Sequence, residues 1–153
     1  MPTPLIRPAT RSDLAAWRPL WDGYNAFYGR SGPTALPEPI TATTWERFFD
    51  PAEPVYALLA EVGGQVVGLA HYLFHRSTIR FEPVCYLPDL FTAEACRGRG
   101  VGRALIEAVY DAARQRKSGR VYWMTHHGNA TARALYDRVA QHTGSVIYAQ
   151  DLG

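Results

Sequence analysis

Cysteine is scarce in this sequence, and long hydrophobic runs are missing from it. The 153 residues include two cysteines, Cys85 and Cys96, which have neither CxxC spacing nor the spacing of zinc ligands. We therefore expect neither a disulfide framework nor a structural metal, and a reduced cytoplasmic compartment. Because no apolar N-terminal run resembles a signal peptide or a membrane span, no membrane association is expected.

Histidines with metal-ligand spacing are lacking as well. His71 and His75 lie in an expected strand, where four residues separate them by roughly 13 Å, too far apart to share one ion. His126 and His127 are adjacent and would face opposite sides of a strand. The sequence therefore predicts no metal site.

Charge of one sign is in small excess. The formal net charge is +2 at pH 7, which argues against a long nucleic-acid-binding track, so no nucleic acid is expected as a partner. The basic residues are nevertheless unevenly placed, because seven of the sixteen lie between Arg97 and Arg120 beside two acids, Glu107 and Asp111. This local excess suits a cofactor that carries phosphate groups.

Apolar residues, in contrast, are plentiful. At 47% hydrophobic, a single domain over residues 1–153 is long enough to bury roughly 68–70% of its unfolded surface. Apolar periodicity and turn residues predict strands at 4–9, 55–62, 65–75, 85–92, 121–125 and 145–150. They predict helices at 10–28, 44–49 and 101–116, another that starts at 128–129, and a loop at 29–39.

The first expected helix carries an aromatic stripe. Large apolar side chains recur at helical spacing: Leu14, Trp17, Leu20, Trp21, Tyr24 and Tyr28. Core packing accounts for most members of such a stripe, since large apolar side chains are usually buried. The alternative, which stays open for some of them, is the wall of a substrate pocket.

The stretch from Arg97 to Gly102, R-G-R-G-V-G, lies between an apolar run and an amphipathic run. A strand, a glycine-rich turn and the start of a helix together form a typical phosphate-binding arrangement, because glycines let the backbone approach a ligand and the free N–H groups favour an anion. Arginine guanidinium groups around the turn suit phosphate oxygens. The alternative is a glycine turn with solvated arginines.

Other binding motifs do not fit this stretch. There is no Gly-Lys-Ser/Thr string for a P-loop, and G-x-G-x-G followed by Arg103 is not the dinucleotide fingerprint G-x-G-x-x-G. A nucleic-acid site built on R-G-R-G is disfavoured because no aromatic residues are interleaved with these arginines.

Two motifs resemble the GNAT family of N-acetyltransferases. Arg97, Gly100 and Gly102 fit its pyrophosphate signature Arg/Gln-x-x-Gly-x-Gly/Ala, and N-A-T-A-R-A-L-Y from Asn129 to Tyr136 fits Asn-x-x-Ala-x-x-Leu-Tyr. Together with the strands between them, the motifs span about half of the chain. The runs C-Y-L-P-D-L-F-T and V-Y-W-M-T further resemble the branch that holds diamine (polyamine) and yeast-type histone acetyltransferases.

The resemblance implies a fold, a cofactor and binding residues. The fold is α/β, with a mixed, mostly antiparallel sheet, a splayed central parallel pair and helices on both faces. The cofactor is acetyl-CoA, whose pantetheine arm would lie between the splayed strands. The implied contacts are Leu90, Phe91, Thr92, Arg97, Gly98, Arg99, Gly100, Val101, Gly102, Arg103, Asn129, Ala132 and Tyr136.

Pro88 lies in the middle of the strand that should flank this gap. Because proline cannot donate to a ladder, it predicts a bulge or a splayed pair. Splaying would leave the N–H groups of Leu90, Phe91 and Thr92 without a strand partner, and the resemblance implies that they bind acetyl-CoA and polarise its carbonyl.

Tyr136 is the candidate general acid for the leaving thiolate. A thiol has a pKa of roughly 8.5 and a phenol about 10, so the phenol could donate a proton if its pKa were lowered in the site. The alternative is a tyrosine that fills core space. Asn129, which the resemblance assigns to the cofactor, could equally cap the helix.

Asp89 is the candidate general base. A lysine-like amine, with a pKa of about 10.4, must lose a proton before it attacks a thioester. In diamine acetyltransferases a glutamate precedes this aspartate, and Pro88 stands at that position here. Glu82 and Glu46 are weaker candidates, and Asp89 could instead pair with an arginine or cap free N–H groups.

The sequence thus predicts an enzyme that transfers the acetyl group of acetyl-CoA to a primary amine of a polyamine-like or lysine-like acceptor, by direct attack in a ternary complex. The acceptor pocket is expected from the 29–39 loop, the first two helices and the first hairpin. A non-catalytic acyl-CoA-sensing module is the alternative, motivated by Pro88. A homodimer is plausible from the family.

Overall fold

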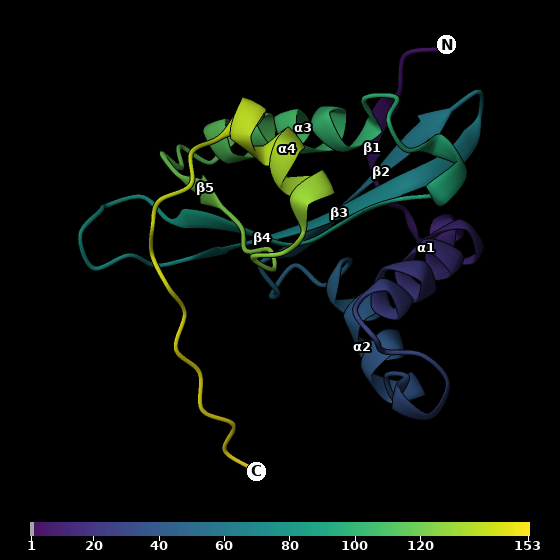
Figure 1. Ribbon diagram of the computed structural model, residues 1–153, viewed down its shortest axis with the longest axis horizontal. Helices are drawn as coiled ribbons and strands as arrows, with labels where there is room; N and C mark the ends of the chain where they lie inside the picture. Colours follow the sequence, from purple (N-terminus) through teal and green to yellow (C-terminus); the bar gives the residue numbers. More distant parts are fainter. Residues whose placement is uncertain (1) are drawn as a thin grey trace.

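The computed structural model describes residues 2–153 and places one mixed sheet between two pairs of helices (Figure 1). The strands are β1 (Leu5–Pro8), β2 (Val55–Val62), β3 (Gln65–His75), β4 (Val84–Thr92) and β5 (Val121–Tyr122), in that spatial order. The helices are α1 (Leu14–Phe27), α2 (Glu38–Arg47), α3 (Val101–Gln115) and α4 (Ala130–Val139). The expected fold is confirmed.

The sheet is antiparallel except at one edge. β1 to β4 pair in antiparallel order, and β5 returns parallel to β4 after α3. The β2–β3 hairpin turns at Gly63 and Gly64, whose φ angles of 60° and 79° require glycine, as the sequence predicts.

Each face of the sheet has its own core. α1 and α2 cover one face with an aromatic cluster: Trp17, Leu20, Trp21, Tyr24, Trp45, Leu59 and Leu69. α3 and α4 lie over the other face, where Val101, Leu105, Ile106 and Val109 of α3 are buried against the sheet. The core interpretation of the aromatic stripe is therefore confirmed for Trp17, Leu20, Trp21 and Tyr24, whereas Leu14, at the start of α1, is exposed.

Two glycines let the helices approach the strands. A Cβ at Gly23 of α1 would come within 2.9 Å of the Phe91 ring on β4. A Cβ at Gly68 of β3 would lie 3.0 Å from Val101 and 3.1 Å from Leu105 on α3. Larger residues at either position would push a helix off the sheet.

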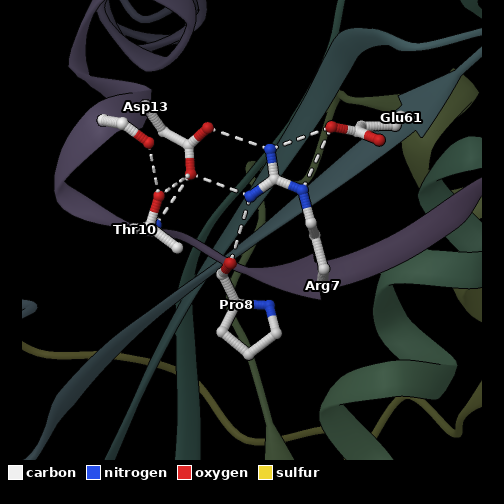
Figure 2. Close-up of polar contacts among 6 residues, drawn as sticks. Arg7, Pro8, Thr10, Asp13 and Glu61 are labelled. Carbon is white, nitrogen blue, oxygen red and sulfur yellow. Dashed lines mark hydrogen bonds and ion pairs between the residues drawn. The ribbon is translucent and has the colours of Figure 1, made fainter.

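Arg7 of β1 connects Asp13, just before α1, with Glu61 of β2 (Figure 2). Its guanidinium donates to both carboxylate oxygens of Asp13, at 2.8 and 2.9 Å, and to Glu61 of β2 at 2.9 and 3.1 Å. Asp13 also accepts from the Thr10 N–H at 2.7 Å, as the acidic residue of a capping box does at a helix start. These bonds hold the pKa of Asp13 well below its usual range, mainly through Arg7.

Three sequence expectations need correction. The loop expected at 29–39 ends earlier, because α2 begins at Glu38 with Pro39 in its first turn, where proline needs no N–H partner. The strand expected at 121–125 is paired only at Val121 and Tyr122. The segment 145–150 forms no strand: after α4 the chain leaves the body and stays exposed (Figure 1).

Candidate active site

The site lies where β4 and β5 separate. They pair only at Cys85 with Val121 and at Tyr86 with Tyr122, and the rest of this β4 edge has no strand partner among residues 2–153. Near the point of separation, Leu87 and Pro88 together oppose the single residue Tyr72 of β3. This is the bulge that Pro88 predicts.

The backbone donors of β4 alternate between its two edges. The N–H of Ala93 donates to the Val67 carbonyl at 2.8 Å, so Phe91, two residues earlier, also turns its N–H toward β3. The N–H groups of Leu90 and Thr92 consequently point into the gap. The expectation of three unpaired donors is therefore wrong for Phe91, whose ring instead packs against α1 at Gly23.

The turn before α3 has the backbone shape that an anion needs. Gly98 and Gly100 adopt φ angles of 76° and 84°, and the space around both is open, so their conformation rather than crowding requires glycine. At Gly102 glycine is favoured by close packing instead, because a Cβ there would lie 3.3 Å from Leu135 of α4. The side chain of Val101 is buried, which leaves only its backbone to face a ligand.

The arginines around this turn have different surroundings. Arg97 donates to the Thr92 carbonyl at 3.0 Å and lies 5.2 Å from the centre of the Phe91 ring, which fixes it between β4 and the turn. Arg99 is exposed, and Arg103 pairs with Glu107 at 2.9 Å. Free N–H groups at a helix start, with cations beside them, suit the pyrophosphate of acetyl-CoA, so these residues fit the cofactor.

Asn129 caps α4, as one of its two interpretations predicts. Its Oδ1 accepts from the Ala132 N–H at 3.4 Å, and its Nδ2 donates to the Thr125 hydroxyl at 3.2 Å. The cap orients the first turn of α4, which carries Ala132, and so sets the position of Tyr136 one turn later.

Tyr136 lies at the gap. It lines a small cavity with Leu87, Pro88, Leu90, Trp123, Met124, Tyr24 and Tyr28. Burial raises the pKa of Tyr136 to about 12, with a smaller contribution from Tyr28, which is opposite to the lowering that a general acid would need. The phenol therefore stays protonated and available as a hydrogen-bond donor at neutral pH.

A buried chain of hydrogen bonds supports Asp89. The indole Nε1–H of Trp17 donates to His71 Nε2 at 3.0 Å, and His71 Nδ1 lies 2.9 Å from Asp89 Oδ2. Because indole only donates, His71 Nε2 accepts and Nδ1 carries the proton toward Asp89. Trp17 and His71 are 0% and 1% exposed, so this geometry is fixed by the core.

Tyr24 of α1 and Tyr28, which follows α1, also lie near Asp89. The Tyr24 hydroxyl donates to the Pro88 carbonyl at 3.1 Å. The pKa values of Tyr24 and Tyr28 are raised, chiefly by burial and then by Asp89, whereas Arg30 acts in the opposite direction on both. Tyr24 and Tyr28, the last members of the stripe, both line the cavity, so the substrate-pocket interpretation stays a prediction for these two.

The other two candidate bases, Glu46 and Glu82, do not line the gap between β4 and β5. Glu46 is on the surface of α2, where it pairs with Arg11 at 2.9 Å, and Glu82 is exposed in the loop between β3 and β4. Sequence reasoning missed His71, considered only as a metal ligand, and Arg30, placed in a loop. The signal that connects His71 to Asp89 is the strand register, which sets the two side by side.

A family model for the acetyltransferase (GNAT) family matches residues 17–140. This chain belongs to that family. It is 37% identical to the D-amino-acid N-acetyltransferase HPA3 of Saccharomyces cerevisiae, over 96% of this chain and 90% of that protein. It is 31% identical to the uncharacterized N-acetyltransferase YhfO of Bacillus subtilis, over 94% of each chain.

The fold has many solved counterparts. The structure of AAC(6')-Iy in complex with a bisubstrate analogue of CoA and acetylneamine superposes with a TM-score of 0.80, covers 99% of both chains and is 19% identical. As a member of the GNAT family, this protein is an acetyl-CoA-dependent N-acetyltransferase, and acetyl-CoA is its co-substrate.

Other chemistries find little support in the described chain. Cys85 and Cys96 are unpaired, and burial raises the pKa of the Cys85 thiol to about 12, so it is a poor nucleophile. Within residues 2–153, no three His, Cys, Asp or Glu side chains gather as metal ligands, and no helix is long and apolar enough to cross a membrane.

Proposed function

We propose that this GNAT enzyme acetylates the primary amine of a small acceptor by direct attack in a ternary complex, with Asp89 as the base. The observation that carries the proposal is the Trp17–His71–Asp89 chain, which holds a carboxylate in one orientation beside the gap. A sensing module would not need a carboxylate fixed in this way. The alternative function is therefore not favoured.

Acetyl-CoA supplies the acetyl group, and the new C–N bond forms as the C–S bond breaks. The turn from Arg97 to Arg103 would hold its phosphates, and Asn129 and Ala132 lie on the neighbouring helix start. The N–H groups of Leu90 and Thr92 point into the gap, where they would stabilise negative charge that develops on a carbonyl oxygen.

Asp89 would accept the proton of the amine, and Tyr136 would donate a hydrogen bond to the leaving sulfur. With His71 bound to Oδ2, the second oxygen of Asp89 remains to accept the proton that the amine loses. Complete proton transfer from Tyr136, with its pKa of about 12, to a thiolate is unfavourable by roughly 5 kcal/mol. We therefore propose that Tyr136 donates a hydrogen bond to the leaving sulfur, which stabilises the thiolate before solvent protonates it.

The acceptor is proposed to be an amino acid. Support comes from the 37% identity, over 96% of this chain, to the D-amino-acid N-acetyltransferase HPA3. The polyamine-like acceptor expected from the narrower resemblance is less well supported, because a polycation needs several acids and Asp89 is the acid that approaches this end of the gap.

The test is thiol release from acetyl-CoA by the purified protein across amino acids of both enantiomers, polyamines, aminoglycosides and lysine peptides, with the product identified by mass spectrometry. The expected result is an N-acetylated amino acid with one equivalent of free thiol. Tight acetyl-CoA binding without acetylation of any amine would overturn the proposal in favour of the sensing module.

We also propose a cytoplasmic homodimer. Val146, Ile147 and Tyr148 are 74%, 65% and 93% exposed in an extended segment, and the sheet edge at β5 is open. This pattern supports exchange of segment 145–150 between two copies as an added strand. Light scattering should show a dimer for the full chain and a monomer after truncation at Ala140; a monomeric full chain would contradict the proposal.

A further inference from the structure

Arg30 is held in place by a buried amide at the C-terminal end of α1. Asn25 is 4% exposed, and its Nδ2 donates to the Trp21 carbonyl at 2.9 Å. This leaves the Asn25 Oδ1 to accept from Arg30 Nε at 2.6 Å, while the Arg30 N–H donates to the Asn25 carbonyl at 2.8 Å. A buried residue thus fixes both the backbone and the side chain of Arg30.

The guanidinium lies over the wall of the cavity. Its central carbon is 5.8 Å from the centre of the Tyr24 ring and 5.7 Å from that of Tyr28, and both tyrosines line the cavity at the β4–β5 gap. Cation–π contact orients the guanidinium plane but leaves its N–H groups able to bind an anion. The two terminal nitrogens of Arg30 donate to no carboxylate in the described chain, unlike those of Arg7 and Arg18.

Asp89 and Arg30 are both neighbours of Tyr24 and Tyr28. The Tyr24 hydroxyl reaches the Pro88 carbonyl, next to Asp89, and the same ring is beneath Arg30. Because Arg30 lies over both rings and the Tyr24 hydroxyl reaches the residue before Asp89, a cation and an anion are both close to these two tyrosines. A ligand that matches this pair carries an amine at one end and an anion at the other.

We propose that Arg30 recognises the acceptor by binding its carboxylate, so that the amine of the same amino acid faces Asp89. This inference rests on the proposed amino-acid acetyltransferase function and adds to it a residue that selects the substrate class. Planar guanidinium and carboxylate groups form two parallel hydrogen bonds, which fixes the direction of the amine as well as the affinity. Because both groups are positively charged, Arg30 would repel the distal ammonium that a polyamine places where the carboxylate would bind.

The proposal differs from a purely structural role for Arg30. A structural arginine would stabilise the end of α1 and affect all acceptors equally. A recognition arginine affects acceptors according to whether they carry a carboxylate, so the decisive quantity is a ratio of two acceptors measured on one protein.

The experiment compares each amino acid, in both enantiomers, with its α-amide and with the amine that lacks the carboxyl group. The proteins are the wild type, Arg30→Gln, Arg30→Lys and the surface control Arg47→Gln, whose arginine lies on α2 at 3.8 Å from Glu53. Thiol release gives kcat/KM for each acceptor, and calorimetry gives acetyl-CoA affinity as a check on folding.

In Arg30→Gln, the ratio of kcat/KM for the acid to that for its amide should fall by about 10- to 100-fold, as expected for loss of a charge-assisted pair. In Arg30→Lys this ratio should lie between the values for the wild type and Arg30→Gln, and in Arg47→Gln it should equal the wild-type value. An unchanged ratio in Arg30→Gln, or a wild-type enzyme that prefers amides or polyamines, would overturn the inference while leaving amine acetylation intact. Absence of thiol release with every acceptor would instead overturn the proposed function itself.

Discussion

The two sides of the β4–β5 gap are built from different kinds of groups. The side proposed for the cofactor uses backbone atoms: the glycine turn at 98–102, the start of α3 and the outward N–H groups of Leu90 and Thr92. The side proposed for the acceptor uses side chains from distant parts of the sequence, namely Trp17, Tyr24, Arg30, His71 and Asp89.

This difference teaches how one fold can keep its cofactor and change its acceptor. A backbone cradle depends on φ angles and on the start of a helix, so substitutions elsewhere leave it intact. The acceptor wall depends on a few side chains on α1 and β3, which can change without disturbing the turn. The two sides should therefore respond separately to mutation.

Asp89→Asn should have the largest effect on catalysis and should leave the binding of acetyl-CoA unchanged. Loss of the base should lower kcat by about 10³-fold, within the usual range for general-base catalysis. Acetyl-CoA affinity should stay at the wild-type value, because Asp89 faces the α1 side of the gap. Rapid-quench or steady-state thiol release checks the rate, and a kcat close to that of the wild type would remove Asp89 from the mechanism.

Tyr136→Phe should have a smaller effect, of about 10² in kcat, comparable with the loss of one transition-state hydrogen-bond donor. The pKa of Tyr136 is raised to about 12, so the phenol remains protonated as pH rises and the wild type should keep this contribution through pH 10. The wild-type to variant ratio of kcat should be constant between pH 7 and about pH 10. A ratio that falls over this interval would indicate an ionising tyrosine.

The sequence predicts the residues of the cofactor side better than those of the acceptor side. Gly98, Gly100 and the start of α3 are contiguous, and their spacing alone indicates a phosphate turn, so the cofactor side follows from a short motif. His71 and Asp89 are partners only because the β3–β4 register places them opposite each other past the bulge at Pro88. A strand register depends on tertiary pairing, which a local pattern does not determine.

The same reasoning accounts for the errors in the fold. The run from Ser145 to Gln150 has strand-like residues, but a strand also needs a neighbouring edge, and within one copy of the described chain none pairs with it. The early start of α2 follows from Pro39, which suits a first helical turn as well as a loop.

Gly100→Ala should affect the cofactor side alone. At φ 84° an alanine costs ~1–2 kcal/mol, and a free turn that relaxes this strain must restore it to bind, so acetyl-CoA should bind roughly 10-fold more weakly. The KM of the acceptor should not change. Steady-state kinetics with each substrate varied in turn provides the measurement, with Gly64→Ala in the distant hairpin turn, at φ 79°, as a matched control for backbone strain.

Arg7→Met should affect stability and leave both sides of the gap unchanged. Removing the guanidinium leaves the largely buried Asp13 without its main partner and should lower the free energy of unfolding by about 2 kcal/mol at pH 7. The folded-state pKa of Asp13 is lowered, so this contribution is complete above its unfolded pKa of about 3.9 and is lost as pH falls below it.

Urea unfolding followed by tryptophan fluorescence checks this prediction. The difference between the wild type and Arg7→Met should be constant near neutral pH and should shrink below about pH 4. A difference that does not change with pH would mean that Arg7 stabilises the fold by packing and not through the carboxylate of Asp13.

The most direct test of separable sides is the calorimetric titration of acetyl-CoA into the wild type, Asp89→Asn and Gly100→Ala without an acceptor. The account predicts equal affinity for the wild type and Asp89→Asn and weaker binding for Gly100→Ala. If Asp89→Asn weakened acetyl-CoA binding as much as Gly100→Ala does, the carboxylate would belong to the cofactor side and the division of the site would be wrong.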